Sequence, residues 1–306
     1  MRKPLPGRVS FWLVGAGVTA IVVGACGGAS PNASTRLQVV AAENFWGSIA
    51  RQIGGDHVQV TTIISNPDAD PHDYEPNAKD SRAIATAKYV IVNGAGYDDW
   101  SDKLQAANPA PGRKTLKVAS IGSRSPGDNP HMWYSPAIVF KVVDAIASDL
   151  EALDPANAAY YDQQAAKFKS ADLARYNDLR AMIKQRYGGT AIGSTESIFD
   201  DLASDLGLDD ITPPAFEKSI SEGEDVSPQD LKTVETQIGS GQIKVLVYNK
   251  QNATQAVRNL VARAKAAGIP VVEITETLEP QNATFQDWQA GQLSMLQTAL
   301  MRAVGR

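Results

Sequence analysis

The sequence predicts an α/β protein of two lobes, each a mainly parallel sheet flanked by helices, joined by one long backbone helix. Two observations support this fold class. Short β-branched segments alternate with helical segments in both halves of the chain, an order typical of βαβ units and parallel sheets. Between the halves, the stretch after Pro155 runs to Tyr187 without glycine or proline, which favours a continuous helix.

The first half opens with an apolar strand over 37–42. Phe45, Ile49 and Ile53 then recur at helical spacing and end at a glycine pair, which predicts a helix. Residues 57–64 alternate and are rich in β-branched side chains, so we expect a second strand, with His57 as an edge or half-buried side chain. The other elements expected in this half are helices over 80–87, 98–107 and 136–153 and strands over 89–93 and 114–119.

The linking segment is expected to be helical over 155–187. Pro155 suits a first helical turn and Gly188-Gly189 suits the stop. Such a helix spans roughly 48 Å at 1.5 Å per residue. A coiled coil is the alternative, but its apolar heptads are poor, and a rigid rod between two lobes explains the length better.

The second half repeats the alternation without an internal sequence repeat. We expect strands over 190–193, 243–248 and 270–274 and helices over 198–206, 229–238, 254–267 and 285–304, with a loop and a short helix within 213–224. Ligands of parallel sheets bind beyond the carboxyl ends of the strands. The strand-end loops are therefore where the chemistry is expected.

The N-terminus predicts export. A cationic start and an apolar run to Val23 lead into Gly24-Ala25-Cys26-Gly27, the pattern of a signal peptide with small residues before its cleavage point. Because Cys26 is the single cysteine, it has no disulfide partner within the chain. The pattern resembles a bacterial lipobox, in which Cys26 becomes the lipidated first residue; an ordinary export signal with an incidental cysteine is the alternative. A lipid anchor holds a protein to a membrane without spanning it.

Charge excludes one class of partner. The 29 Lys and Arg, less the three in the signal segment, against 34 Asp and Glu leave the exported chain at about −8. Nucleic-acid binding needs a basic footprint, so we expect no nucleic-acid partner.

Two proline-flanked histidines organise the candidate site. His72 lies in Asp70-Pro71-His72-Asp73-Tyr74-Glu75-Pro76, and His131 lies in Asn129-Pro130-His131-Met132-Trp133-Tyr134-Ser135-Pro136. Proline fixes its own φ and restricts the residue before it, so each Pro-His pair is a stiff mount suited to a metal ligand. Each stretch follows a predicted strand of the first half.

These two stretches resemble the metal-binding signature of the solute-binding lipoproteins of manganese and zinc ABC transporters, the family with a rigid interdomain helix. The resemblance extends over residues 37–304. It implies extracytoplasmic capture of Zn²⁺ or Mn²⁺ by a monomer, anchored to the outer face of the cell membrane, which delivers the ion to an ABC permease. It also implies the domain limits, which are a signal peptide at 1–25, a lipidated tether at 26–36, metal-binding lobes at 37–154 and 189–306, and a linking helix at 155–188.

The resemblance assigns four ligands, His72, His131, Glu196 and Glu276. Relatives generally have His, Glu or Asp at the third place and Asp or Glu at the fourth, and Glu is the less usual fourth ligand. Asp70, Glu75, Glu273 and Glu279 are therefore alternatives, and helix capping is an alternative role for Glu196. Two imidazoles and two carboxylates suit either metal, so the ligand types leave Zn²⁺ and Mn²⁺ both open.

Two other functions compete with metal capture. A metal-dependent hydrolase usually keeps an open metal position for water, whereas four protein ligands close the site. The sequence also lacks H-E-x-x-H and a G-x-S-x-G elbow, so we expect no enzyme. A surface adhesin is the second alternative, for which the sequence offers no repeat or binding motif.

Overall fold

A computed structural model describes residue 7, residues 36–66 and residues 74–305. The predicted signal segment, Cys26, Asp70 and His72 lie outside the described residues. Residues 36–306 form one compact unit, and the description below concerns this unit. Among the described residues, no helix combines the length and the apolar character that crossing a membrane requires.

The first lobe contains a four-stranded sheet of β1 (Leu37–Glu43), β2 (Val58–Ile64), β3 (Tyr89–Val92) and β4 (Lys114–Lys117). The strand order is β2-β1-β3-β4 and every pairing is parallel. Its helices are α1 (Asn44–Gly54), α2 (Ala78–Thr86), α3 (Asp99–Ala107), α4 (Val118–Gly122) and α5 (Pro136–Leu153), with short 3₁₀ turns η1 (Gly55–His57) and η3 (Met132–Tyr134).

The second lobe repeats this topology. Its strands β5 (Ala191–Ser194), β6 (Asp209–Asp210), β7 (Val245–Asn249) and β8 (Val271–Ile274) lie in the order β6-β5-β7-β8, again all parallel. Its helices are η6 (Ser197–Phe199), α8 (Asp200–Leu206), α9 (Pro214–Ser221), α10 (Pro228–Gly239), α11 (Gln255–Ala266) and α12 (Phe285–Val304). The predicted fold class is confirmed.

The linking segment differs from the expected uninterrupted α-helix. It consists of η4 (Pro155–Asn157), α6 (Ala158–Lys167), a π-helical turn η5 (Phe168–Asp172) and α7 (Ala174–Tyr187). The buried side chains explain the π turn. Phe168 and Leu173 are both fully buried although they are five residues apart, a spacing that an α-helix places on different faces. Leu173 N–H donates to the Phe168 carbonyl at 2.9 Å, which closes the wider turn.

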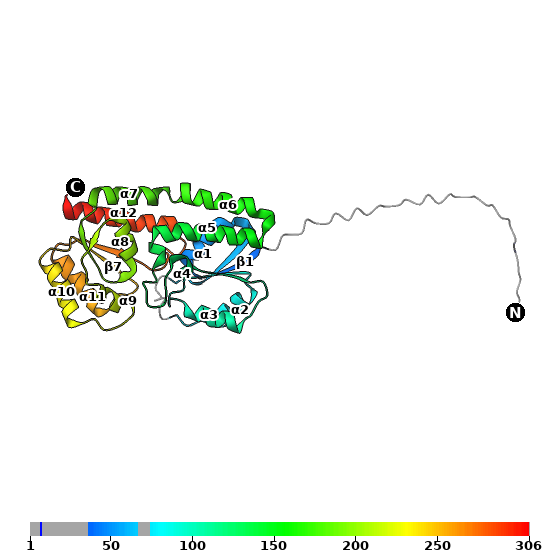
Figure 1. The fold of residues 1–306 in the computed structure, drawn as a ribbon, viewed down its shortest axis with the longest axis horizontal. Coiled ribbons are helices and arrows are strands. Elements are labelled where there is room, and N and C mark those ends of the chain that lie inside the picture. The colour runs from blue at the N-terminus through cyan, green and yellow to red at the C-terminus, as the bar shows by residue number, and fades with distance from the viewer. Residues whose placement is uncertain (1–6, 8–35, 67–73, 306) are drawn as a thin grey trace. The chain divides into compact units, whose positions relative to one another are not determined.

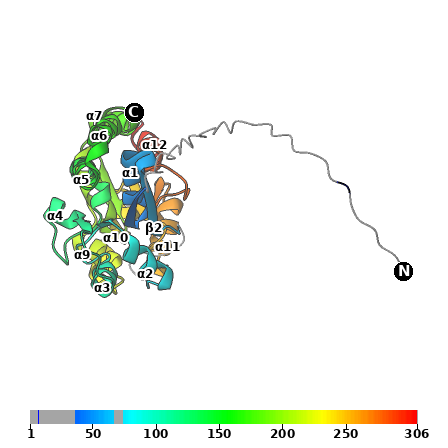
Figure 2. The same ribbon diagram turned by 90° about the vertical axis from the view of Figure 1, so that its right-hand side faces the viewer.

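The linking helices lie along the same edge of both lobes in both views (Figures 1 and 2). α6 packs against α5 and α1 of the first lobe, whereas α7 packs against α12 and α8 of the second. α12 in turn reaches α1, where Phe285 N–H donates to the Ser48 hydroxyl at 3.0 Å. One continuous apolar core runs through both lobes and the linking helices, so the lobes are braced together.

Two further local expectations are corrected, and one short strand was not expected. Val118 and Ala119, expected in a strand, begin α4 instead. His57, expected to start a strand, lies in η1, where its half-buried ring packs edge-on against Tyr160 at 4.7 Å between centroids. The two-residue strand β6 was not expected, because so short a segment carries no periodicity.

Candidate metal centre

His131 lies on the first lobe, immediately before η3, and is 1% exposed. Its Nδ1 lies 2.8 Å from Asn129 Oδ1, and its backbone N–H donates to the same oxygen at 3.0 Å. This pair of contacts fixes the plane of the ring. With Nδ1 engaged, Nε2 is the nitrogen suited to bind a cation, the usual arrangement when a second group orients a histidine ligand.

The Trp133 ring packs against the ring of His131. Trp133 is fully buried in the core. Its ring lies 5.2 Å from the His131 ring and stacks on Phe45 at 4.1 Å, both between centroids. This apolar packing excludes water from one side of the imidazole.

The second lobe contributes two buried glutamates. Glu196 follows β5 and is 1% exposed, and Glu276 follows β8 and is fully buried. Although Glu196 immediately precedes η6, its side chain makes no capping hydrogen bond, which excludes the capping role considered from the sequence. Its carboxylate instead belongs to the cluster described next.

His131, Glu196 and Glu276 converge. Each offers one ligand atom, and these three atoms all lie within 4.8 Å of one another. No other group of three or more His, Cys, Asp or Glu side chains in the described part of the chain approaches this closely. One imidazole and two carboxylates at this spacing suit a divalent transition-metal cation.

Neutral donors surround both carboxylates. Asn249 Nδ2 donates to Glu196 Oε1 at 2.6 Å and to Glu276 Oε1 at 2.7 Å. Asn252 Nδ2 donates to Glu196 Oε2 at 2.8 Å, and the Tyr97 hydroxyl donates to Glu276 Oε2 at 2.6 Å. These amides and the hydroxyl hold the acids in place and leave their two negative charges for a cation.

The alternative carboxylates that the structure describes lie outside the cluster. Glu273 is exposed and accepts a hydrogen bond from the Tyr248 hydroxyl at 2.9 Å. Glu279 is exposed and pairs with Lys250, and Glu75 is exposed. His72 and Asp70 belong to the segment 67–73 outside the described residues, so the role of His72 stays a prediction.

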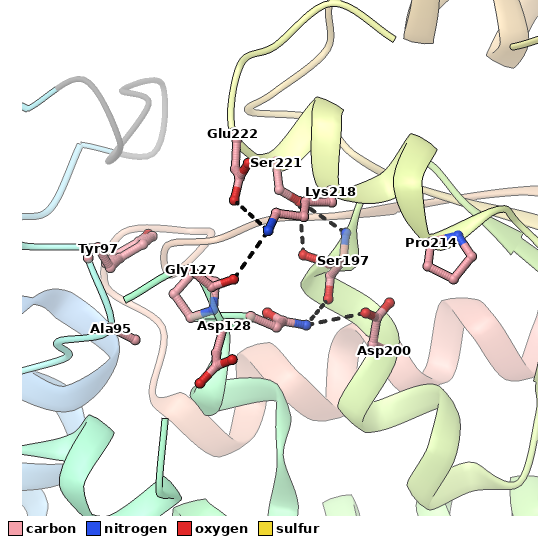
Figure 3. Close-up of a pocket in the computed structure, with 13 residues that line it drawn as sticks. Ala95, Tyr97, Gly127, Asp128, Ser197, Asp200, Pro214, Lys218, Ser221 and Glu222 are labelled. Atoms are coloured by element: carbon pink, nitrogen blue, oxygen red, sulfur yellow. Dashed lines mark hydrogen bonds and ion pairs between the residues drawn. The ribbon is translucent and has the colours of Figure 1, made fainter. Parts of the chain in front are cut away.

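A cavity of about 330 Å³ adjoins the cluster. Figure 3 shows it between Tyr97 and the loop at Gly127 on one side and Ser197, Asp200 and Lys218 on the other. Tyr97 donates to Glu276, and Ser197 directly follows Glu196. The cavity therefore lies beside the cluster, although none of its three candidate ligands lines it.

The loop before His131, residues 123–130, contacts the second lobe. Asn129, which orients the imidazole, also donates from Nδ2 to the Ser197 carbonyl at 2.6 Å. Arg124 forms an ion pair with Asp201 at 2.9 Å. The His131 ring and the segment after Glu196 are thus positioned by the same side chain, so the cluster is held in a fixed geometry across the lobes.

Buried acids outside the cluster have strongly shifted pKa values. Burial, together with repulsion from the nearby Asp210, Asp200 and Glu196, raises the pKa of Glu217 to about 11. Glu217 is 5% exposed, and its Oε1 has no hydrogen-bond partner among the described residues. Burial followed by repulsion from Asp98 raises the pKa of Glu43 well above its usual range. Glu217 is therefore neutral at pH 7.

Sequence reasoning missed Tyr97, Asn249 and Asn252. Asn249 ends the strand that lies between those leading to Glu196 and Glu276, so knowledge of the strand order would have identified it. Strand order was unknown from the sequence. Tyr97 lies 179 residues from Glu276, and no local pattern marks such a pair.

Comparison with known proteins agrees with this geometry. A protein-family model described as "Zinc-uptake complex component A periplasmic" (ZnuA) matches residues 39–299. The chain belongs to this family. The resemblance inferred from the two Pro-His stretches is therefore confirmed at the level of the family, which consists of substrate-binding components of transport systems rather than a known class of enzymes.

Curated relatives share about a quarter of their residues with the chain. The zinc-binding lipoprotein AdcA of Streptococcus pneumoniae is 26% identical over 265 residues, which are 79% of this chain and 50% of AdcA. The metal ABC transporter substrate-binding lipoprotein FimA of Streptococcus parasanguinis is 24% identical over 262 residues, 80% of this chain and 81% of FimA. The chain thus spans about half the length of AdcA and most of the length of FimA.

Solved structures agree in fold. A periplasmic metal-binding protein from Candidatus Liberibacter asiaticus superposes with a TM-score of 0.71 at 22% identity, covering 87% of this chain and 100% of that one. The solute-binding protein FpvC from Pseudomonas aeruginosa in complex with Mn²⁺ gives 0.69 at 23% identity, covering 88% and 99%. At these identities the similarity establishes the two-lobed fold.

Proposed function

We propose that this chain captures Zn²⁺ or Mn²⁺ outside the cytoplasm and delivers it to an ABC transporter permease for uptake. The observation that carries the proposal is the convergence of His131, Glu196 and Glu276, whose ligand atoms lie within 4.8 Å of one another in buried surroundings. A buried dication needs compensating charge, and two glutamates supply it. Relatives named as zinc-binding and manganese-binding lipoproteins support the same cargo.

His72 is the proposed fourth ligand. It follows β2 in the sequence, and β2 lies in the same parallel sheet as β4, which precedes the His131 loop. A fourth protein ligand closes a tetrahedral site and leaves no open position for a catalytic water. Such a site suits carriage rather than hydrolysis.

The anchor and the partner complete the proposal. Lipidation at Cys26 after removal of residues 1–25, with 26–36 as a tether, places a monomer at the outer face of the cell membrane. The names of AdcA and FimA as lipoproteins support this location. The limits of the two lobes at 37–154 and 189–306 and of the linking helix at 155–188 belong to the same proposal.

Metal loading tests the proposed function. The protein purified without added metal should carry Zn²⁺ or Mn²⁺ by elemental analysis, and adding either ion to the stripped protein should raise its melting temperature, because a ligand that binds the folded state alone stabilises it. Mg²⁺ serves as a control cation. The absence of any shift at saturating Zn²⁺ and Mn²⁺ would contradict the proposal.

The Tyr97 hydroxyl gives a milder prediction. Tyr97→Phe removes the donor 2.6 Å from Glu276 Oε2 and keeps the ring. Loss of a group that orients a ligand typically weakens metal binding by about 10-fold or more. Competition with a chelator measures the change. Tyr74→Phe, which removes a hydroxyl that donates to Asp80, should leave metal affinity unchanged; an equal loss in both variants would refute a specific role for Tyr97.

A further inference from the structure

Asn249 occupies a special position in the second sheet. The strand order is β6-β5-β7-β8, so β7 lies between β5 and β8. Glu196 lies two residues beyond the end of β5, Glu276 lies two residues beyond the end of β8, and Asn249 ends β7. Because the strands are parallel, all three strand ends lie at one edge. The topology therefore places the Asn249 amide between the two acids.

The orientation of this amide is fixed by the backbone. Asn249 Oδ1 accepts the Gln251 N–H at 2.9 Å, so Nδ2 must face the glutamates. Its two hydrogens match its two contacts, 2.6 Å to Glu196 and 2.7 Å to Glu276. Asn249 is fully buried, so these bonds are shielded from bulk solvent. One rigid, short side chain thus sets the distance between the two carboxylates.

Gln251, two residues after Asn249, also holds the backbone of Glu276. Gln251 Oε1 accepts the N–H groups of Glu276 and Thr277 at 2.7 and 3.1 Å. Asn249 and Gln251 together therefore hold both the carboxylate and the main chain of Glu276, whereas Asn249 and Asn252 contact only the carboxylate of Glu196. Because an amide is neutral, it holds the two carboxylates without cancelling their charge. An arginine or lysine at this position would cancel part of that charge.

We propose that Asn249 is a positioning residue that raises the affinity of the site for Mn²⁺ relative to Zn²⁺. The inference rests on the proposed function and adds a determinant of selectivity to it. Carboxylate oxygens suit Mn²⁺, whereas imidazole nitrogen suits Zn²⁺ and Zn²⁺ binds more strongly to most sites. Mn²⁺ therefore depends more on two carboxylates held ready at a fixed separation. When the amide is lost, mutual repulsion spreads the acids, and the cost falls mainly on Mn²⁺.

The test compares Asn249→Ala with the native protein for both metals by chelator competition. We expect Mn²⁺ affinity to fall by about 10- to 100-fold, the usual range for a lost orienting group, and Zn²⁺ affinity to fall by less. Asn249→Ser, whose hydroxyl can donate to one glutamate at a time, should give an intermediate change in the affinity ratio and serves if the alanine variant does not fold. Asn252→Ala is the matched control, because Asn252 donates to Glu196 without reaching Glu276; its Mn²⁺ to Zn²⁺ affinity ratio should stay nearer to the native one.

The outcomes separate the two proposals. A native protein that binds neither metal overturns the proposed function. A native protein that binds both, with unchanged affinities in the Asn249 variants or with equal losses for Mn²⁺ and Zn²⁺, overturns the role of Asn249 and leaves metal capture standing. A fall in the Mn²⁺ to Zn²⁺ ratio in the Asn249 variants beyond that in Asn252→Ala supports the inference.

Discussion

The double variant Glu196→Gln/Glu276→Gln should show no rise in melting temperature with Zn²⁺ or Mn²⁺. At a free metal concentration of about 1,000 times the dissociation constant, binding stabilises a folded protein by about 4 kcal/mol. For a chain of this size that corresponds to a shift of roughly 8 °C. Glutamine keeps the size of the side chains and removes both negative charges, which leaves a buried dication without compensation. Differential scanning fluorimetry with and without metal measures the shift.

The matched control uses two glutamates of the same chain segment. Glu273 and Glu279 flank Glu276 in sequence and are exposed, so Glu273→Gln/Glu279→Gln removes the same charge without touching the cluster. This control should keep the full metal shift. A lost shift in the control with a retained shift in Glu196→Gln/Glu276→Gln would move the ligand assignment to the neighbouring acids.

Glu217→Gln should stabilise the metal-free protein at pH 7 by about 3 kcal/mol. The pKa of Glu217 is raised from 4.5 to about 11 in the folded state. Between these values the folded protein holds a proton that the unfolded chain has released, so stability falls as pH rises. The penalty is absent below pH 4.5 and grows through the neutral range. Glutamine stays neutral throughout.

Urea unfolding at several pH values measures this effect. The difference in unfolding free energy between Glu217→Gln and the native protein should be small near pH 4.5 and increase steadily up to pH 8. Glu222→Gln changes an exposed glutamate next to the same helix α9 and should follow the native curve. Parallel native and Glu217→Gln curves across this range would show that Glu217 ionises normally.

Elements with strong local signals were predicted well. The helix expected over 136–153 is α5, and the helix expected over 285–304 is α12, with the same limits. α5 begins with proline at its first position, and α12 begins after Thr284, whose hydroxyl accepts the Asp287 N–H. Such start signals depend on neighbouring residues alone, so they are visible in the sequence.

Elements whose structure depends on distant contacts were not predicted correctly. Val118 and Ala119 are apolar and follow a strand, yet Ala119 N–H bonds the Asn93 carbonyl at 2.8 Å, and the chain turns into α4. The π turn between α6 and α7 exists because Phe168 and Leu173 must both face the core. Neither requirement can be known before the partners are in place.

The sequence by itself determined the alternation of strands and helices and the proline-flanked histidine His131, because each depends on residues close together in the chain. The family resemblance had grouped Glu196 and Glu276 with His131. Only the tertiary structure decided how closely their ligand atoms converge, that Tyr97 reaches Glu276 from the other lobe, and that Asn249 donates to both acids. The order of strands in a sheet is set by packing of segments far apart in sequence. The side chains that meet at the strand ends therefore become visible only when the sheet is assembled.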